Sequence, residues 1–412
     1  MDYGLIGEKL SHSFSKEIHE QIFDYKYGIK EIPKDEIDAF MKAKDFRGIN
    51  VTIPYKQTVI PYLDEISDRA RKIGAVNTVY NKDGHLYGDN TDFSGMVALI
   101  RRNGIELEGR KVLILGSGGT SKTAFAAAED MGAREIYRVS RSAKDGAISY
   151  EDALKNHTDA EIIINTTPCG MFPNTDSVPV DIDLFPRLEG VVDAVYNPIR
   201  TKLVVSALNR GIRATGGLYM LVAQAVFAGE IFTQTAVREE KTEGVYKNML
   251  RAKENIVLTG MPGCGKSTIG KLVARELGMS FVDSDARIVE KAGRSIPEIF
   301  ESVGEQGFRD IEEQVIAELS LLQNTVIATG GGAVLRQENV DGLRRNGRIY
   351  FLDRDIEFLV TTKDRPLSSD REMLRQRYNE RYDIYRSTAD KIIRCTKSKK
   401  VNVGKIKDDF TE

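Results

Sequence analysis

The chain lacks the features of a zinc protein, a disulfide-rich protein or a membrane protein. Its three cysteines, Cys169, Cys264 and Cys395, stand far apart without CxxC or Cys–His spacing, which argues against a zinc site and a disulfide framework. The longest apolar stretch, residues 218–229, is too short to span a bilayer and contains Gln224. We find no basic region followed by an apolar stretch at the N-terminus, so we expect no signal peptide and a cytoplasmic protein.

The chain also lacks an excess of positive or negative charge, with 59 lysines and arginines against 61 aspartates and glutamates. The net charge is −2, which argues against a nucleic-acid or membrane-surface partner and favours small-molecule substrates. With 412 residues the chain is too long for one hydrophobic core and suits two or three domains. Apolar strand-length runs alternate with amphipathic helix-length stretches from residue 2 to about 235, which predicts parallel sheets covered by helices. The alternation restarts at Asn255, after a highly charged stretch.

Residues 256–270 read IVLTGMPGCGKSTIG, an apolar strand, a glycine turn and the start of a helix that we expect at 266–277. Gly260-x-x-x-x-Gly265-Lys266-Ser267 has the full spacing of a phosphate-binding loop. Its backbone N–H groups would face phosphate oxygens, Lys266 would reach the β- and γ-phosphates, and the Ser267 hydroxyl would ligate Mg²⁺. We therefore expect ATP and Mg²⁺ on this loop, held by Gly260, Pro262, Gly263, Cys264, Gly265, Lys266, Ser267 and Thr268.

Charged residues that follow the loop suggest a phosphoryl acceptor. In FVDSD (281–285), Asp283 could hold Mg²⁺ through water and Asp285 could accept a hydroxyl proton. No histidine follows residue 255, which favours a carboxylate as general base. Arg309, Arg365 and Arg381 could grip an anionic acceptor or the transferring phosphoryl group, although a single arginine on a helix is more often a solvated surface residue.

A second nucleotide site is predicted at KVLILGSGGTSKTAFAAAEDMG (111–132), a strand, a glycine turn and a helix that suit a dinucleotide pyrophosphate. Ser121 occupies the third position of the G-x-G-x-x-G pattern, and a plain tight turn is the alternative. The next strand ends in Ser140-Arg141-Ser142, which suits the 2′-phosphate of NADP, the alternative being an exposed arginine at a strand end.

Two residues upstream of this turn form an opposite-charge pair suited to proton transfer, Lys56 in NVTIPYK (50–56) and Asp92 in GDNTDFSG (88–95). If they meet in a cleft, Asp92 would orient Lys56 and hold its ammonium form, while desolvation would oppose that charge. A solvated surface lysine is the alternative for Lys56.

The C-terminal part resembles shikimate kinase over nearly all of residues 255–395. The matching motifs are the P-loop, D-S-D at 283–285, F-R-x-x-E at 308–312, T-G-G-G at 329–332, R-P-L at 365–367 and R-x-x-x-Y at 381–385. The resemblance implies that shikimate is bound by Asp285, Arg309, Gly331, Gly332 and Arg381, and that Arg365 closes over the site as a lid arginine. The lid segment VTTKDRPLSS is shorter than expected and lacks an obvious second arginine, for which Lys363 is a partial substitute.

Residues 2 to about 235 resemble shikimate dehydrogenase. The matching motifs are H-S-x-S at 12–15, N-V-T-x-P-x-K at 50–56 and N-T-D at 90–92, with NTTPCGM, DAVYNP and GGLYMLVAQA further on. The resemblance implies that Lys56 and Asp92 carry the proton chemistry. It also implies substrate contacts from Ser13, Ser15, Thr52, Asn77, Asp92, Tyr196 and Gln224, and NADP contacts from Gly116, Ser117, Gly118, Gly119, Thr120, Ser140, Arg141, Ser142 and Gly217. Lys9, Lys16 and Asp145 depart from the family's usual residues.

The two resemblances predict a bifunctional α/β enzyme that reduces 3-dehydroshikimate to shikimate with NADPH and then phosphorylates shikimate with ATP and Mg²⁺. We expect four parts: an α/β substrate-binding domain at 1–92, completed by helices at about 215–235; a Rossmann-type NADP-binding domain at 93–235; a charged helical linker at 236–254; and a P-loop kinase domain with a parallel sheet at 255–412. A monomer and a homodimer are both compatible with the sequence. The rival hypotheses are a quinate-using dehydrogenase joined to a kinase for another small acid, and a nucleotide-dependent sensor or scaffold without turnover.

Overall fold

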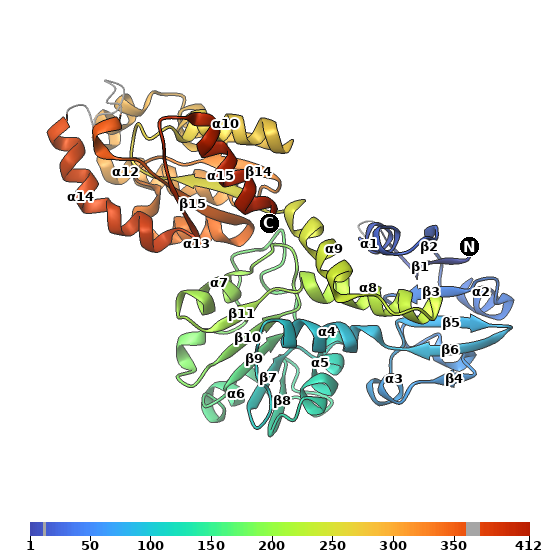
Figure 1. The fold of residues 1–412 in the computed structure, drawn as a ribbon. Helices are drawn as coiled ribbons and strands as arrows, with labels where there is room; N and C mark the ends of the chain where they lie inside the picture. The colour runs from blue at the N-terminus through green and yellow to red at the C-terminus, as the bar shows by residue number, and fades with distance from the viewer. Residues whose placement is uncertain (11–13, 360–370) are drawn as a thin grey trace. The chain divides into compact units, whose positions relative to one another are not determined.

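The computed structural model describes residues 1–10, 14–359 and 371–412. Its internal contacts divide the chain into two compact units, Met1–Asn197 with Leu203–Asn248, and Pro198–Lys202 with Met249–Glu412. Three separate sheets and the helices packed on them confirm the α/β class expected from the sequence (Figure 1). The finer division into four parts stays a prediction. Among the described residues, no helix has the length and apolar character that a membrane crossing requires.

The first sheet belongs to the first unit and has the strand order β2-β1-β3-β5-β6-β4. Its strands are β1 (Tyr3–Gly7), β2 (Tyr27–Glu31), β3 (Gly48–Val51), β4 (Glu65–Ile66), β5 (Thr78–Lys82) and β6 (His85–Asp89), with helices α1 (Ser15–Ile22), α2 (Ile37–Ala43) and α3 (Asp68–Ile73). The sheet is mixed, because β5 runs antiparallel to β3 and β6. Asp83 and Gly84 join β5 to β6 with φ values of 53° and 86°, the two positive angles of a tight hairpin turn.

The second sheet, also in the first unit, is parallel throughout, in the order β11-β10-β9-β7-β8. Its strands are β7 (Lys111–Leu115), β8 (Glu135–Val139), β9 (Ile162–Asn165), β10 (Gly190–Asp193) and β11 (Arg213–Thr215). The helices are α4 (Thr91–Arg102), α5 (Gly119–Asp130), α6 (Tyr150–Asn156), α7 (Lys202–Asn209), α8 (Leu218–Thr233) and α9 (Glu239–Arg251). Helices α4 and α8 run side by side (Figure 1), so closely that a Cβ on Gly95 would lie 2.8 Å from the Met220 carbonyl oxygen.

The sheet of the second unit is parallel and has the order β13-β14-β12-β15-β16. Its strands are β12 (Asn255–Thr259), β13 (Ser280–Asp283), β14 (Thr325–Ala328), β15 (Gly347–Asp353) and β16 (Lys391–Arg394). The helices are α10 (Lys266–Leu277), α11 (Ser284–Ala292), α12 (Ile296–Leu319), α13 (Gln337–Asn346), α14 (Arg371–Thr388) and α15 (Lys399–Thr411). Helix α10 spans the residues predicted for it and ends at Gly278, whose φ of 67° suits a residue without a Cβ.

Candidate active sites

Lys56 and Asp92 meet in a cavity of about 480 Å³ in the first unit. Lys56 follows β3, and Asp92 lies in the first turn of α4. The Lys56 Nζ donates to the Asp92 Oδ2 over 2.5 Å, and the two side chains are 28% and 20% exposed. This ion pair is therefore partly desolvated yet open to a small molecule in the cavity, as the sequence predicts for a proton-transfer pair.

Buried amides and hydroxyls fix the start of α4, and with it Asp92. The Asn77 Oδ1 accepts from the Thr91 N–H over 2.7 Å, and the Thr78 and Thr91 hydroxyls lie 3.0 Å apart. The Asn90 side chain caps the helix by accepting from the Phe93 N–H, and its amide donates to the Ala75 carbonyl oxygen over 2.9 Å. Apart from Asn77, sequence reasoning gave these residues no role, because their contacts cross between β5 and α4.

The same cavity collects most of the residues predicted to contact substrate. Its lining includes Ser15, Thr52, Asn77, Tyr196 and Gln224. Burial raises the pKa of the Tyr196 hydroxyl above its usual range, so this group remains a hydrogen-bond donor at neutral pH. Two residues predicted for the cofactor, Thr120 and Gly217, line this cavity too, as does Lys9. Ser13 lies outside the described residues.

The glycine turn after β7 has the backbone that a pyrophosphate site needs. Gly116 has a φ of 120°, and α5 starts at Gly119 with Gly118 as its N-cap. A Cβ on Gly118 or Gly119 would meet nothing within 4 Å, so both face open space. Ser121, at the third position of the pattern, is buried and donates its hydroxyl hydrogen to the Gly116 carbonyl oxygen over 2.7 Å. This bond stabilises the turn, which explains why a serine occupies the third position of the pattern.

Ser117 and the end of β8 complete this predicted nucleotide region. Ser117 lies between Gly116 and Gly118 in the turn. Arg141 is exposed, and the Ser140 and Ser142 hydroxyls lie 3.3 Å apart beside it. An exposed guanidinium flanked by two hydroxyls provides donors for a phosphate monoester.

The second unit has a cavity of about 660 Å³ that begins at the P-loop. Gly260, Gly263 and Gly265 have φ values of 139°, 80° and 103°, and α10 starts directly after them. The Lys266 Nζ donates to the Gly260 carbonyl oxygen over 2.7 Å, and the Ser267 hydroxyl donates to the Asp283 Oδ2 over 2.5 Å. The structure thus brings together the hydroxyl and the carboxylate predicted for Mg²⁺, both of them oxygen donors that suit this ion.

Most of the P-loop residues line this cavity, but not every one of their side chains does. Pro262, Gly263, Gly265 and Thr268 line the cavity with Lys266 and Ser267. The Cys264 side chain is fully buried and belongs to the hydrophobic core of the unit. Any contact of Cys264 or Gly260 with a nucleotide would therefore come from the backbone.

The lining of the same cavity includes the residues predicted for the acceptor, Asp285, Arg309, Gly331, Gly332 and Arg381. The Arg381 Nη1 donates to the Gly331 carbonyl oxygen over 3.1 Å, and burial lowers the pKa of Arg381. A Cβ on Gly332 would collide with the Arg309 guanidinium, which explains glycine at that position. Arg365 lies outside the described residues, as does Lys363.

Sequence reasoning gave no role to three charged residues of this lining, namely Glu312, Arg354 and Lys399. Glu312 is fully buried, and its Oε2 accepts from the Arg309 Nη1 over 2.6 Å. Burial raises the pKa of Glu312, an effect that the nearby Arg309 opposes. The signal for Glu312 was its place in F-R-x-x-E, one helical turn after Arg309. Arg354 and Lys399 have no comparable motif.

The folds of the two units define the class of the protein: an α/β enzyme that joins a Rossmann-like oxidoreductase unit to a P-loop phosphotransferase unit. A model of the shikimate dehydrogenase substrate binding domain matches residues 5–79, and a model of shikimate kinase matches residues 262–410. The chain is similar to shikimate dehydrogenase (NADP(+)) of Clostridium beijerinckii, with 40% identity over 259 residues that cover 59% of this chain and 96% of the relative. It is similarly related to that of Clostridium perfringens strain 13, with 39% identity, 60% of this chain and 97% of the relative.

Solved structures give the same result for the first unit. A chorismate mutase/shikimate 5-dehydrogenase fusion protein from Clostridium acetobutylicum matches with a TM-score of 0.57 and 37% identity, covering 60% of this chain and 96% of that one. Shikimate 5-dehydrogenase from Thermus thermophilus, in complex with NADP(H) and shikimate, has a TM-score of 0.55, 27% identity, and coverage of 60% and 99%. The chain belongs to the shikimate dehydrogenase family and carries a shikimate kinase domain after it, as a fusion of an NADP-dependent oxidoreductase with a phosphotransferase.

Proposed function

We propose that the chain reduces 3-dehydroshikimate to shikimate and then phosphorylates shikimate at its 3-hydroxyl. The observation that carries this proposal is that each unit holds its own charged pair in its own cavity, Lys56 with Asp92 in one and Arg309 with Glu312 in the other. The product of the first reaction is the acceptor of the second. The free cysteines fit a reducing compartment, so a cytoplasmic location is part of the proposal.

In the dehydrogenase unit, Lys56 would donate a proton to the oxygen of the ketone as it becomes a hydroxyl. Asp92 holds the Lys56 ammonium by a 2.5 Å bond and keeps it aimed into the cavity. Ser15, Thr52 and Gln224 supply hydroxyl and amide groups to the same cavity, which suits a polyhydroxylated acid. NADP would lie on the N-terminus of α5 with Arg141 on its 2′-phosphate, because the glycines there face open space.

In the kinase unit, Asp285 would accept the proton of the attacking hydroxyl, while Arg309 and Arg381 bind the carboxylate of the acceptor. The backbone N–H groups of the P-loop and Lys266 would hold the phosphates. Ser267 and Asp283 would hold Mg²⁺. When bound, NADPH supplies the hydride, and ATP with Mg²⁺ supplies the phosphoryl group and neutralises its charge.

The test is to incubate the purified full-length protein with 3-dehydroshikimate, NADPH, ATP and Mg²⁺, and to follow NADPH oxidation and ADP release together. Lys56→Gln should abolish the first signal and leave ADP release from added shikimate unchanged, whereas Asp285→Asn should do the reverse. Lys42→Gln is a matched control, because Lys42 is 67% exposed and pairs with Asp38 on the surface. Loss of both signals in either variant, or of neither, would contradict the assigned residues.

The same assay separates the rival functions. A quinate-using dehydrogenase would reduce 3-dehydroquinate faster than 3-dehydroshikimate. Ser15 lines the cavity, and its small side chain favours 3-dehydroshikimate, so we expect the opposite preference. A protein that binds both nucleotides without turnover would identify a sensor or scaffold.

A further inference from the structure

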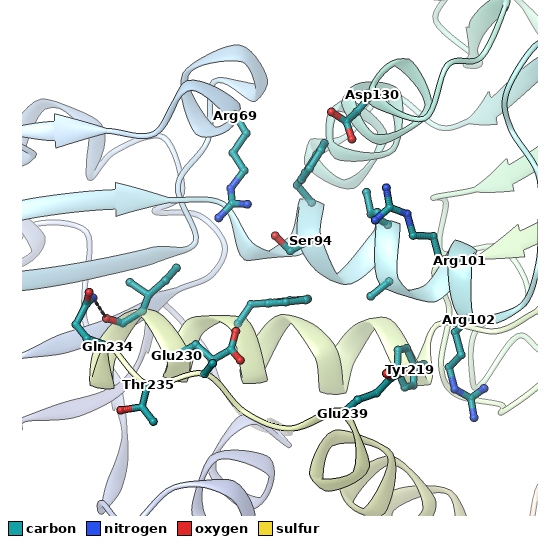
Figure 2. A pocket seen from close by; sticks show the side chains of 16 residues that line it. Arg69, Ser94, Arg101, Arg102, Asp130, Tyr219, Glu230, Gln234, Thr235 and Glu239 are labelled. Atoms are coloured by element: carbon teal, nitrogen blue, oxygen red, sulfur yellow. Dashed lines mark hydrogen bonds between the residues drawn. The ribbon is translucent and has the colours of Figure 1, made fainter.

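A second cavity of about 850 Å³ lies in the first unit, separate from the cavity of Lys56 and Asp92. Figure 2 shows it between α4 and α8, with Arg69 extending from α3 and Asp130 from α5. The lining also includes Gln234 and Thr235 from the segment that joins α8 to α9, and Glu239, the first residue of α9. Among the described residues, none lines both cavities. Its volume lies within the range of small-molecule sites.

The floor of this cavity is apolar. Phe93, Val97 and Ala98 come from α4, and Phe227 and Ile231 come from α8. Val97 is 8% exposed, and Phe93, Ala98 and Phe227 are partly buried side chains that pack against the core of the unit. Aromatic rings at such a floor favour contact with another ring or a large aliphatic group.

The rim carries charges of both signs, and some of them are already paired. Arg69 bonds to Asp89, and Arg102 donates to both oxygens of Glu243, over 3.0 and 2.7 Å.

Other charges on the rim are available to a ligand. The side chains of Arg101, Asp130 and Glu239 have no hydrogen-bond or ion-pair partner within the part of the chain that the structure describes. Glu230 accepts from the Val237 N–H over 2.6 Å and can accept further hydrogen bonds. The cavity therefore offers one available guanidinium and several carboxylates above an apolar floor.

This combination identifies the chemical class of the ligand. An arginine binds a carboxylate by two parallel hydrogen bonds, and carboxylates bind an ammonium group. A dianion would meet Asp130, Glu230 and Glu239 unfavourably, and a cation without a carboxylate would leave Arg101 unused. We propose that this cavity binds an α-amino acid with an aromatic or large aliphatic side chain and that this binding regulates the dehydrogenase unit.

The coupling to the dehydrogenase site follows from shared helices. Asp92 and Phe93 are consecutive residues of α4, one lining each cavity. On α8, Gln224 lines the first cavity and Phe227 the second. Because α4 and α8 contact each other at Gly95 without space for a methyl group, a shift of one helix displaces the other.

Arg69 supplies a second link. It holds Asp89, and the Asp89 Oδ1 also accepts from the Asn90 N–H over 2.7 Å at the start of α4. A ligand that fills the cavity and displaces the Arg69 side chain weakens this anchor of Asp92. Inhibition is therefore the expected sign, with kcat/KM for 3-dehydroshikimate falling about fivefold or more at saturation.

The test measures binding to the full-length protein by titration calorimetry, with L-phenylalanine and L-leucine as probes. Comparators are 3-phenylpropionate, which lacks the ammonium group, and phenethylamine, which lacks the carboxylate. We expect saturable binding of at least one amino acid and at least tenfold weaker binding of both comparators. Arg101→Gln should weaken amino-acid binding about tenfold or more without changing the activity measured in its absence. Arg238→Gln is the matched control, because Arg238 is exposed nearby but does not line the cavity.

The inference is overturned if neither amino acid binds, if a comparator binds as tightly, or if the two arginine variants bind alike. Complete exclusion of the amino acid by saturating shikimate, rather than a limited weakening of its affinity, would place the ligand in the first cavity and also overturn the inference. Binding without any change in dehydrogenase rate would refute the regulatory part. Calorimetry does not depend on turnover, so these outcomes are distinct from a failure of the proposed activities.

Discussion

Glu312→Gln is the substitution for which the structure gives the sharpest expectation about the kinase unit. Arg309 has two carboxylate partners on its own helix, Glu312 and Glu305. Glu312 is fully buried, with 2.6 Å between its Oε2 and the Arg309 Nη1, whereas the Glu305 side chain is 50% exposed and its Oε1 lies 3.2 Å from the Arg309 Nη2. One arginine therefore offers a buried pair and an exposed pair for comparison.

The magnitude follows from burial. Removing one partner of a buried ion pair costs about 3–5 kcal/mol, but glutamine retains the shape and one acceptor oxygen. The remaining loss is the difference between a charge-assisted and a neutral hydrogen bond, about 1–2 kcal/mol, or about five- to thirtyfold in kcat/KM for shikimate. The Glu305→Gln variant should lose about fivefold at most, because exposed pairs contribute about 0–1 kcal/mol.

The assay is ADP release at varied shikimate and varied ATP. We expect Glu312→Gln to raise KM for shikimate more than KM for ATP, because Arg309 is the residue proposed to bind the carboxylate of the acceptor. Circular dichroism and the dehydrogenase rate of the same variant report whether the chain is folded. Equal effects of the two substitutions, or an effect confined to ATP, would show that Arg309 does not depend on Glu312 for binding the acceptor.

Three further predictions concern the stability of the first unit. Burial lowers the pKa of His19 from 6.5 to about 3, so at this position only the unfolded chain binds a proton as the pH falls below 6.5. The free energy of unfolding, measured with urea, should therefore fall by about 2 kcal/mol between neutral pH and pH 5. In the His19→Gln variant this part of the pH dependence should be absent. Gly95→Ala should destabilise the unit by about 1–3 kcal/mol in thermal unfolding, whereas Gly244→Ala, where a Cβ meets nothing within 4 Å, should be neutral or stabilising. The Arg102 guanidinium lies 4.8 Å from the Tyr219 ring and 4.5 Å from the Tyr246 ring, and it bonds to Glu243 on α9. Arg102→Met should therefore lower the free energy of opening of α9 by about 1–2 kcal/mol and speed its amide hydrogen exchange. Unchanged exchange would refute this role of Arg102.

The sequence predicts most reliably what short segments determine by themselves. The P-loop glycines need positive φ values at fixed spacing, and the structure has them at Gly260, Gly263 and Gly265. The pairing of Lys56 with Asp92 joins two segments, and the opposite charges of the two residues, together with the family resemblance of both motifs, made it expected. The roles of these residues in catalysis stay predictions.

Contacts between distant elements were beyond prediction. The bond from Ser121 to the Gly116 carbonyl oxygen explains an apparent departure from the glycine pattern, but only the folded turn shows it. The buried side chain of Cys264 and the mixed first sheet are two other cases, since each depends on neighbours that no local pattern encodes. The cavity between α4 and α8 has no motif at all, because its lining comes from five segments with ordinary surface composition.

The two sites use the same structural device to position a carboxylate. Asp92 lies in the first turn of α4, capped by Asn90, and Asp285 lies in the first turn of α11, capped by Asp283. Each cap residue is placed at or after the end of a strand, so the sheet fixes the helix start and the helix start fixes the carboxylate.

Asp283, the N-cap of α11, also contacts the P-loop. The Asp283 Oδ1 accepts from the Asp285 N–H over 3.0 Å, while its Oδ2 accepts from the Ser267 hydroxyl. One carboxylate thus links the residue proposed for proton transfer to the residues proposed for Mg²⁺. In α4 the Asn90 side chain has one oxygen, and it accepts from the Phe93 N–H. No second carboxylate oxygen is left there for a metal ion, which is consistent with a proposed reaction in which the Lys56 ammonium supplies the positive charge. An amide cap, Asn90, therefore accompanies the proposed ketone reduction, and a carboxylate cap, Asp283, accompanies the proposed Mg²⁺-dependent phosphoryl transfer.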